Sequence, residues 1–270
     1  MPTLMESKID ARQHSLIKSV LVAQTNSLGT LEAPIVEDLL RKRKCRDVLD
    51  IGCGEGSFLL DVAARLKGTR FLGIDHNERA VRDARRGLRR RDLRNVKFEA
   101  AFFDPAFAAD RRDAVITRYT LQHSSRPSDF LDAAFARLKK NGLFVALESL
   151  DAYTDSPEPD PVWQRYRTAL AAIHKRIGSD ANIGRSLGRL LRTAGFRDIG
   201  VWVVLCSPST VGWARFRGVV RASAQLAFGF FSDLFNADLL KDINAWLDDR
   251  AALEKRDPYL CSAIAHGTRP

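Results

Sequence analysis

The sequence predicts an α/β protein built on a mostly parallel, doubly wound sheet of seven strands, with helical cap insertions. Two observations lead to this fold class. Between Arg46 and Glu148, short β-rich runs alternate with helical patterns, and such alternation produces a parallel sheet with crossover helices. Beyond Glu148 the pattern is mainly helical, but two further β-rich runs follow, and we expect them to return to the same sheet.

Residue periodicity indicates where the first elements lie. The expected strands are Asp47–Ile51, Phe71–Asp75, Val96–Ala100, Asp113–Leu121 and Leu143–Glu148. Asn77 has a side chain that can cap the helix after the second strand. Residues Phe130–Lys140 are amphipathic and predict a helix that stops at Asn141-Gly142.

The second half of the chain carries helices that we expect to cap the sheet. Asp160-Pro161 has the chemistry of an N-cap followed by a first helical residue. A long helical insertion is expected at about Thr210–Leu253, between last strands at about 199–206 and 258–265. We predict a single domain over residues 1–270, with a core at about 46–150 and a helical cap formed by about 1–40, 151–185 and 208–256.

The composition is that of an ordinary soluble globular protein, with 45% hydrophobic and 28% charged residues. No apolar run approaches the roughly 20 residues that span a bilayer. Residues 1–10 are polar and lack the apolar stretch of a signal peptide, so we expect a cytoplasmic protein. The cysteines at 45, 53, 206 and 261 have neither disulfide-framework nor zinc-site spacing, and we predict no metal.

The formal net charge of +10 raises the question of nucleic-acid binding, because Lys and Arg side chains displace counterions from phosphate backbones. Much of the excess lies at residues 41–46 and between Arg82 and Lys97. No aromatic residue interrupts the second cluster to stack on bases. We therefore interpret the cluster as a solvated, arginine-rich helix face, and we keep nucleic acid as an alternative partner.

A glycine-rich turn after the first strand is the clearest functional signal. Gly52, Gly54 and Gly56 follow Asp50, and glycine allows a tight turn with positive φ and the close approach of a ligand. The turn would lie at the carboxyl end of the strand, where open α/β sheets bind ligands. Asp75 ends the second strand, where a carboxylate can accept hydrogen bonds from both hydroxyls of a ribose. Together these residues predict a nucleotide-type cofactor site.

Two details of this turn argue against a dinucleotide. The dinucleotide fingerprint is Gly-x-Gly-x-x-Gly, whereas Ser57 stands at the position of its third glycine. Glu55 also adds a negative charge that would repel a pyrophosphate. A ligand that carries a sulfonium and an ammonium group tolerates such an acid.

Residues Val48–Phe58 are similar to motif I of class I (seven-stranded, Rossmann-like) S-adenosylmethionine-dependent methyltransferases of the small-molecule branch. The resemblance continues in the family's order through residues 71–75, 104, 119–123 and 138–142, and it covers about Arg46–Ser149. It implies S-adenosyl-L-methionine as cofactor and S-adenosyl-L-homocysteine as product. The cofactor contacts that it implies are Asp50, Gly52, Cys53, Gly54, Gly56, Asp75, His76, Phe103, Asp104 and Arg118.

The resemblance also implies a role for the principal contacts. The turn would hold the methionine portion of the cofactor, Asp75 would bind the ribose, and Asp104 would accept a hydrogen bond from the adenine amino group. Phe103 and His76 would flank the adenine ring. An alternative for Asp104 is a loop acid that caps a turn. The sequence departs from the family at residues 140–142, where Lys-Asn-Gly replaces the usual Pro-Gly-Gly.

His123 and Tyr119 are the candidate catalytic residues, because they follow the fourth strand, where this family opens its acceptor pocket. An imidazole is suited to taking a proton from a hydroxyl or an amine. The alternative is that His123 only anchors the loop. The tetrad of residues 104–107, Asp-Pro-Ala-Phe, resembles the Asp-Pro-Pro-Tyr box of nucleic-acid amino-methyltransferases. We reject it because it comes before the fourth strand rather than at its end.

Seven aromatic residues crowd the insertion between residues 208 and 246. They predict an apolar wall for a small methyl acceptor, the core of the insertion, or the contact of a homodimer. We expect a methyltransferase that acts on O, N or C of a small organic molecule such as a secondary metabolite. One alternative is an RNA or protein methyltransferase. The other is a methyltransferase-like protein that binds the cofactor without methyl transfer.

Overall fold

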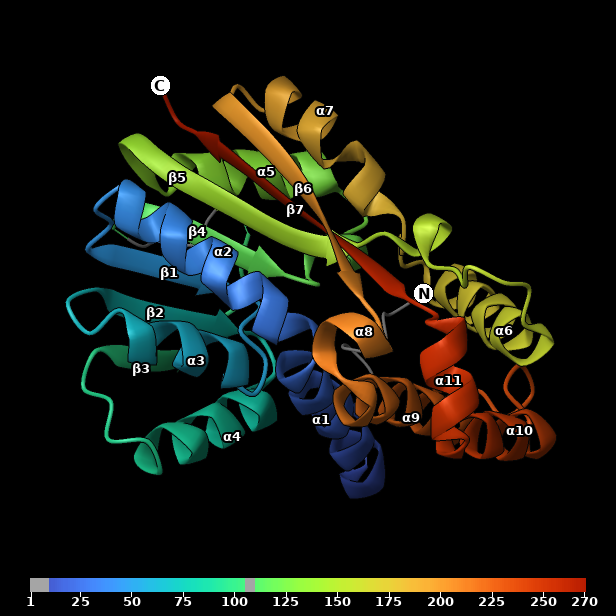
Figure 1. Cartoon of the computed structure of the whole chain (residues 1–270). Helices are drawn as coiled ribbons and strands as arrows, with labels where there is room; N and C mark the ends of the chain where they lie inside the picture. Colours follow the sequence, from blue (N-terminus) through green and yellow to red (C-terminus); the bar gives the residue numbers. More distant parts are fainter. Residues whose placement is uncertain (1–9, 105–109) are drawn as a thin grey trace. The chain divides into compact units, whose positions relative to one another are not determined.

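The computed structural model describes residues 10–104 and 110–270 (Figure 1). Its strands are β1 (Asp47–Ile51), β2 (Arg70–Asp75), β3 (Val96–Ala100), β4 (Arg112–Arg118), β5 (Leu138–Ser149), β6 (Arg197–Cys206) and β7 (Leu260–Thr268). They form one sheet in the order β3-β2-β1-β4-β5-β7-β6. The pairs from β3 to β5 are parallel, and β7 runs antiparallel to β5. The predicted fold class is confirmed. Because β1 lies between β2 and β4, the strand order reverses at β1, where such sheets bind ligands.

The chain divides into two compact units. The sheet unit comprises Glu32–Ser149, Asn182–Val203 and Ser262–Pro270. The helical unit comprises Met1–Leu31, Leu150–Ala181 and Val204–Cys261. The second set corresponds closely to the predicted helical cap, and the single-domain organisation stays a prediction.

Within the described residues the sheet unit contains five helices, of which α4 (Glu78–Arg89) begins with the side-chain cap that the sequence predicted. They are α2 (Leu28–Lys42, of which Glu32 onward belongs here), α3 (Ser57–Arg65), α4, α5 (Pro127–Ala136) and α7 (Leu187–Thr193), with short 3-10 turns η1 (Leu121–His123) and η3 (Ile183–Ser186). The side chain of Asn77 accepts hydrogen bonds from the amides of Arg79 and Ala80 at the start of α4. The predicted cap is therefore confirmed.

Two predicted boundaries were wrong because tertiary contacts override local pattern. Helix α5 ends at Ala136, not at Lys140, since Leu138 already pairs with Arg112 of β4. Asn141 then turns with a φ of 60° while its amide donates to the Arg269 carbonyl at 2.7 Å. Strand β4 ends at Arg118, not at Leu121, because Tyr119 adopts a left-handed φ of 50°.

The helical unit has an aromatic core. Its helices are α1 (Ala11–Asn26), α6 (Pro161–Ile177), α8 (Pro208–Val211), α9 (Trp213–Phe230), α10 (Ala237–Asp248) and α11 (Arg250–Arg256), with a 3-10 turn η2 (Asp151–Tyr153). The Trp163 ring stacks on Tyr166 and Trp246, with centroid distances of 5.1 and 5.3 Å. Phe216 and Phe235 are fully buried in the same cluster. The aromatic residues of the insertion therefore mainly form its core rather than an exposed pocket wall.

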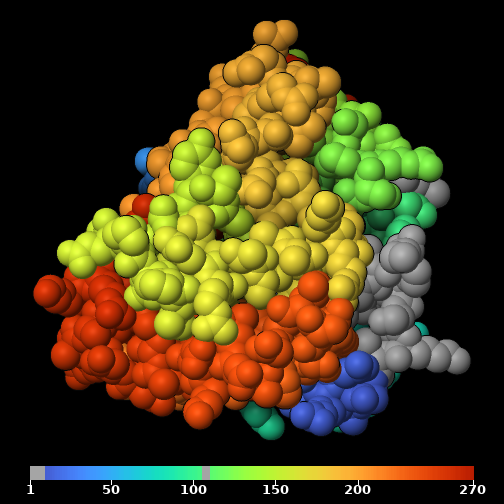
Figure 2. Space-filling view, turned by 90° about the vertical axis from the view of Figure 1, so that its right-hand side faces the viewer, coloured from blue at the N-terminus to red at the C-terminus, as the bar shows by residue number. Residues whose placement is uncertain are grey.

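Helices α6 and α10 meet along one face of the helical unit, where the yellow side chains of α6 border the orange-red side chains of α10 (Figure 2). An ion pair between Arg165 of α6 and Asp242 of α10, at 2.7 Å, joins them at the surface. Within the two ranges that the structure describes, no helix is both long and apolar enough to cross a membrane.

Asp160 should be a strong determinant of the helical unit's stability. Its Oδ1 accepts hydrogen bonds from the amides of Val162 and Trp163, at 3.0 Å each, and its Oδ2 accepts one from Trp246 Nε1 at 2.8 Å. Asp160→Ala removes a helix cap and leaves a buried indole N–H unpaired, so we expect a loss on the order of 2 kcal/mol or more. Urea unfolding followed by tryptophan fluorescence measures it.

Asn236→Ala is the matched control, because Asn236 caps α10 through a single bond to the Leu239 amide. We expect it to cost about 1 kcal/mol. Equal losses for the two variants would contradict the special role of Asp160.

Candidate functional site

The glycine turn after β1 has the backbone geometry that the sequence predicted. Gly52, Gly54 and Gly56 have φ values of 76°, 55° and 80°, which L-residues with a Cβ rarely adopt. A Cβ at Gly56 would lie 2.7 Å from the Phe98 ring, and one at Gly52 would collide with the Thr120 side chain. A side chain at Gly52 or Gly56 would therefore require its neighbours to move.

Asp75 ties this turn to the start of α4. Its carboxylate is 5% exposed, and it accepts hydrogen bonds from the amides of Gly54 at 2.9 Å and Asn77 at 2.8 Å. The amides of Gly52 and Cys53 donate to the Ile74 carbonyl at 2.9 and 3.0 Å. The ends of β1 and β2 are therefore joined through backbone groups, with the predicted ribose acid at the junction.

Asp50 presents a buried carboxylate at the end of β1. The residue is 3% exposed, and its Oδ1 has no hydrogen-bond partner within residues 10–104 and 110–270. Burial raises the pKa of Asp50 to about 7, with Arg118 lowering it and Asp75 raising it further. Buried polar atoms in native proteins are nearly always paired. Asp50 Oδ1 is therefore an exception, and it lies next to the glycine turn in the sequence.

Arg118 and Tyr119 belong to a buried polar network centred on Glu32, which is 0% exposed. Glu32 accepts hydrogen bonds from Arg118 Nε and from the Tyr119 hydroxyl, both at 2.7 Å, and from the Ser262 hydroxyl at 3.0 Å. The Arg118 guanidinium lies 4.6 Å from the centre of the Phe58 ring. Sequence reasoning missed Glu32, since an acid in an amphipathic helix gives no sign of being buried.

This network bears on the role of Tyr119. Burial, followed by the negative charge of Glu32, raises the pKa of the Tyr119 hydroxyl well above its usual value. The hydroxyl therefore stays protonated and donates to Glu32. A catalytic role for Tyr119 stays a prediction, and its geometry favours a positioning role.

Glu148, near the end of β5, was also missed as a site residue. It is 0% exposed and accepts hydrogen bonds from three consecutive amides, those of Thr120, Leu121 and Gln122, at 3.1, 2.8 and 3.2 Å. Burial raises the pKa of Glu148 to about 8, and the three backbone N–H groups lower it. Glu148 thus binds the loop that carries the candidate base.

His123 lies at the end of that loop and is half-buried. Its amide donates to the Thr120 carbonyl at 3.0 Å, and its Nε2 lies 3.2 Å from Gln122 Nε2. These contacts fix the backbone of His123 in the loop that follows β4. Its role as a base stays a prediction.

The residues expected to flank an adenine ring form two separate aromatic contacts. The Phe103 ring packs edge-on against Phe130 at 5.1 Å, whereas the His76 ring lies 6.3 Å from that of Phe102. Phe102 is 65% exposed and is a further candidate that sequence reasoning did not single out. Asp104 is half-buried, and the rest of the Asp-Pro-Ala-Phe tetrad lies outside the described residues.

Among residues 10–104 and 110–270, no group of three or more His, Cys, Asp or Glu side chains is placed to hold a metal ion. The absence of a metal stays a prediction. Burial raises the pKa of the Cys53 thiol well above its usual value, so this cysteine contributes backbone and bulk to the turn rather than a thiolate.

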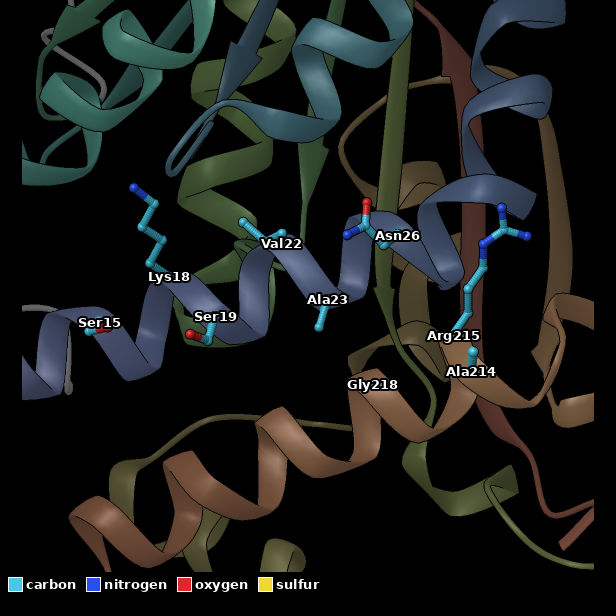
Figure 3. A pocket seen from close by; sticks show the side chains of 9 residues that line it. All are labelled: Ser15, Lys18, Ser19, Val22, Ala23, Asn26, Ala214, Arg215 and Gly218. Carbon is cyan, nitrogen blue, oxygen red and sulfur yellow. The ribbon is translucent and has the colours of Figure 1, made fainter. Parts of the chain in front are cut away.

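The helical unit has a groove of its own, of about 700 Å³, between α1 and the start of α9 (Figure 3). Small side chains such as Ser19, Ala23 and Ala214 line it, and Lys18 and Arg215 extend on the same side of the two helices. No carboxylate is among its lining residues. Its volume is typical of small-molecule sites.

Comparison with known proteins places the chain in a family. Residues 42–176, half of the chain, match the family described as "Methyltransferase domain". The 24-methylenesterol C-methyltransferase 2 of rice (Oryza sativa subsp. japonica) is 30% identical over 200 residues, which cover 67% of this chain and 50% of that protein. The chain thus spans half the length of this curated relative.

Two solved structures show the same fold. The phosphoethanolamine N-methyltransferase 2 of Haemonchus contortus, in complex with phosphomonomethylethanolamine and S-adenosylhomocysteine, has a TM-score of 0.50 at 15% identity, over 83% of this chain and 49% of that one. The [4+2]-cyclase SpnF has a TM-score of 0.51 at 20% identity, over 87% of this chain and 80% of that one. The family match spans β1 to β5 and includes the whole glycine turn, and it shows that this chain belongs to the methyltransferase domain family.

Proposed function

We propose that the protein is an S-adenosyl-L-methionine-dependent methyltransferase that acts on an oxygen, nitrogen or carbon atom of a small organic molecule. The orphaned Oδ1 of Asp50, beside three left-handed glycines, is the observation that carries this proposal. A buried carboxylate of raised pKa gains most from a ligand that brings a positive charge. The amino group and the sulfonium of this cofactor are such charges, whereas a pyrophosphate would be repelled.

The other residues of the site fit the same cofactor. Asp75 would accept hydrogen bonds from the ribose, and Asp104, with Phe102 and Phe103 nearby in sequence, would receive the adenine. Cys53 would contribute through the backbone of the turn, and Arg118, held by Glu32, would balance the charge of Asp50. The description of the Haemonchus structure, solved with S-adenosylhomocysteine, supports this choice for a protein of the same fold.

Bound S-adenosyl-L-methionine would supply an electrophilic methyl group on a sulfonium. The chain's own tasks are to align the acceptor atom and to keep it deprotonated. Alignment of this kind can contribute roughly 7–11 kcal/mol to catalysis when the reacting groups are well oriented. His123 is the residue that we propose as the base, because it is half-buried and its backbone is held to Thr120 in the loop after β4.

A small acceptor is better supported than RNA. Four residues of the arginine-rich cluster are engaged within the chain: Arg85 donates to the Phe98 carbonyl, and Arg82, Arg86 and Arg91 pair with nearby acids. The rice relative is named as a sterol C-methyltransferase, which also points to a small organic acceptor. Binding of RNA that weakens with salt would favour the alternative instead.

The second alternative, a methyltransferase-like protein without methyl transfer, keeps the same cofactor site. The cyclase SpnF shares the fold and is named for a different reaction. A screen for transfer of labelled methyl from S-adenosyl-L-methionine to metabolite extracts separates the two, because only a methyltransferase labels an acceptor. The cytoplasmic location and the homodimer stay predictions.

Asp75→Asn should weaken the binding of S-adenosylhomocysteine at least about tenfold, because a neutral amide replaces the charged acceptor for the ribose. Isothermal titration calorimetry measures the affinity. Asp113→Asn is the matched control: Asp113 also accepts two backbone amides, those of Arg46 and Asp47, but at the amino ends of the strands. Unchanged affinity in Asp75→Asn would refute the assignment.

Binding of S-adenosylhomocysteine should release a proton from Asp50. In the free protein the pKa of Asp50 is about 7, so at pH 6 the carboxyl is mainly protonated. The cofactor's ammonium would lower this pKa, so the bound carboxyl loses its proton and affinity rises from pH 5 to pH 7. Calorimetry in buffers of different ionisation enthalpy counts the proton. The Asp50→Asn variant should release no proton on binding. Equal proton release by the variant and the unaltered protein would argue against a contact between Asp50 and the cofactor's ammonium group.

His123→Ala should lower turnover by about 10²-fold or more if the imidazole is the base, while leaving the affinity for S-adenosylhomocysteine unchanged. Turnover is measured as methyl transfer to the acceptor found in the labelled-methyl screen, and the affinity is measured by calorimetry. Full activity of the variant would remove His123 from the mechanism.

A further inference from the structure

The contacts of Glu148 concern a part of the site that the cofactor assignments do not use. Its side chain comes from β5, yet its three partners are the consecutive amides of Thr120, Leu121 and Gln122, at the start of η1. The first amides of a helical turn have no partner within the turn. One carboxylate from the neighbouring strand satisfies all three, so the position of this loop depends on a single side chain.

The loop so held packs directly against the glycine turn. The single O–H of Thr120 lies within hydrogen-bond distance of two carbonyl oxygens, those of Ile51 at 3.3 Å and Arg118 at 3.1 Å. The side chain of Thr120 fills the space in which Gly52 would otherwise carry a Cβ, with its Cγ2 at 2.7 Å from that position. No space remains for even one methyl group, and any shift of Thr120 therefore changes the support under Gly52.

We propose that Glu148 is a positioning residue of the cofactor site: by holding the amides of residues 120–122 it keeps Thr120 against Gly52 and so sets the conformation of the glycine turn. The same hold places His123, whose amide donates to the Thr120 carbonyl. A buried acid is costly unless hydrogen bonds compensate for its lost hydration. The hydrogen bonds that compensate Glu148 fix the loop after β4, and Thr120 of this loop packs against the turn after β1. The inference rests on the proposed function only in taking the turn as the cofactor site.

Glu148→Gln tests this contact directly at pH 9, above the pKa of about 8 of Glu148. At that pH it keeps the side chain's size and replaces one acceptor oxygen of the carboxylate by an N–H donor that faces backbone N–H groups. We expect the affinity for S-adenosylhomocysteine to fall about tenfold, equivalent to about 1.4 kcal/mol. We also expect the amides of Gly52, Cys53 and Gly54 to exchange with deuterium about tenfold faster in the ligand-free protein. Both are measured at a temperature where the variant is folded by circular dichroism.

Asp113→Asn is again the matched control. A role limited to stability would lower the melting temperature of both variants and leave affinity and glycine-turn exchange unchanged in both. That result would overturn the proposal. The proposal is supported if Glu148→Gln loses affinity for S-adenosylhomocysteine and protection of the glycine-turn amides from exchange, while Asp113→Asn loses neither.

A double-mutant cycle tests the route through Thr120. Thr120→Ala removes the atoms that contact Gly52, so Glu148→Gln should have little further effect on affinity in that background. Additive effects would contradict transmission through Thr120. If the unaltered protein does not bind S-adenosylhomocysteine, the proposed function fails, while the exchange of the ligand-free glycine turn still supports or overturns the role of Glu148.

Discussion

The candidate site depends on one backbone constraint, namely that residues 52, 54 and 56 all turn with positive φ between β1 and α3. This conformation brings the Gly54 amide to Asp75 and the amides of Gly52 and Cys53 to the Ile74 carbonyl. These hydrogen bonds join the parallel strands β1 and β2 at their carboxyl ends, beyond Ile51 and Ile74, the last residues that pair in the sheet. The turn leaves its outer backbone accessible, because glycine has no side chain to cover it.

Buried carboxylates surround this turn, and each is compensated differently. Asp75 and Glu148 accept backbone amides, and Glu32 accepts a guanidinium and two hydroxyls. Asp50 alone among these four acids keeps one oxygen without a partner in the described residues. Burial raises the pKa of both Asp50 and Glu148, because a buried negative charge is expensive. The missing partner of one oxygen is what distinguishes Asp50 from the other three acids.

Much of the fold and the centre of the site could be predicted from local sequence signals. Strand β1, the cap Asn77 and the three glycines follow from patterns that span a few residues. The end of α5 and the start of β5 could not be predicted, because Leu138 joins β5 through pairing with a strand 26 positions earlier in the chain, at Arg112. Glu32 and Glu148 escaped notice for a similar reason. Their partners lie at least 26 residues away, and no short motif records such contacts.

The division into two units has a consequence for how the polypeptide reaches its native state. Each unit is assembled from three separate stretches, and the backbone passes from one to the other five times, at Leu31, Ser149, Ala181, Val203 and Cys261. No single cut of the backbone therefore yields either unit as an intact fragment. Such interleaving gives many contacts between residues far apart in the sequence, and contacts of this kind slow folding.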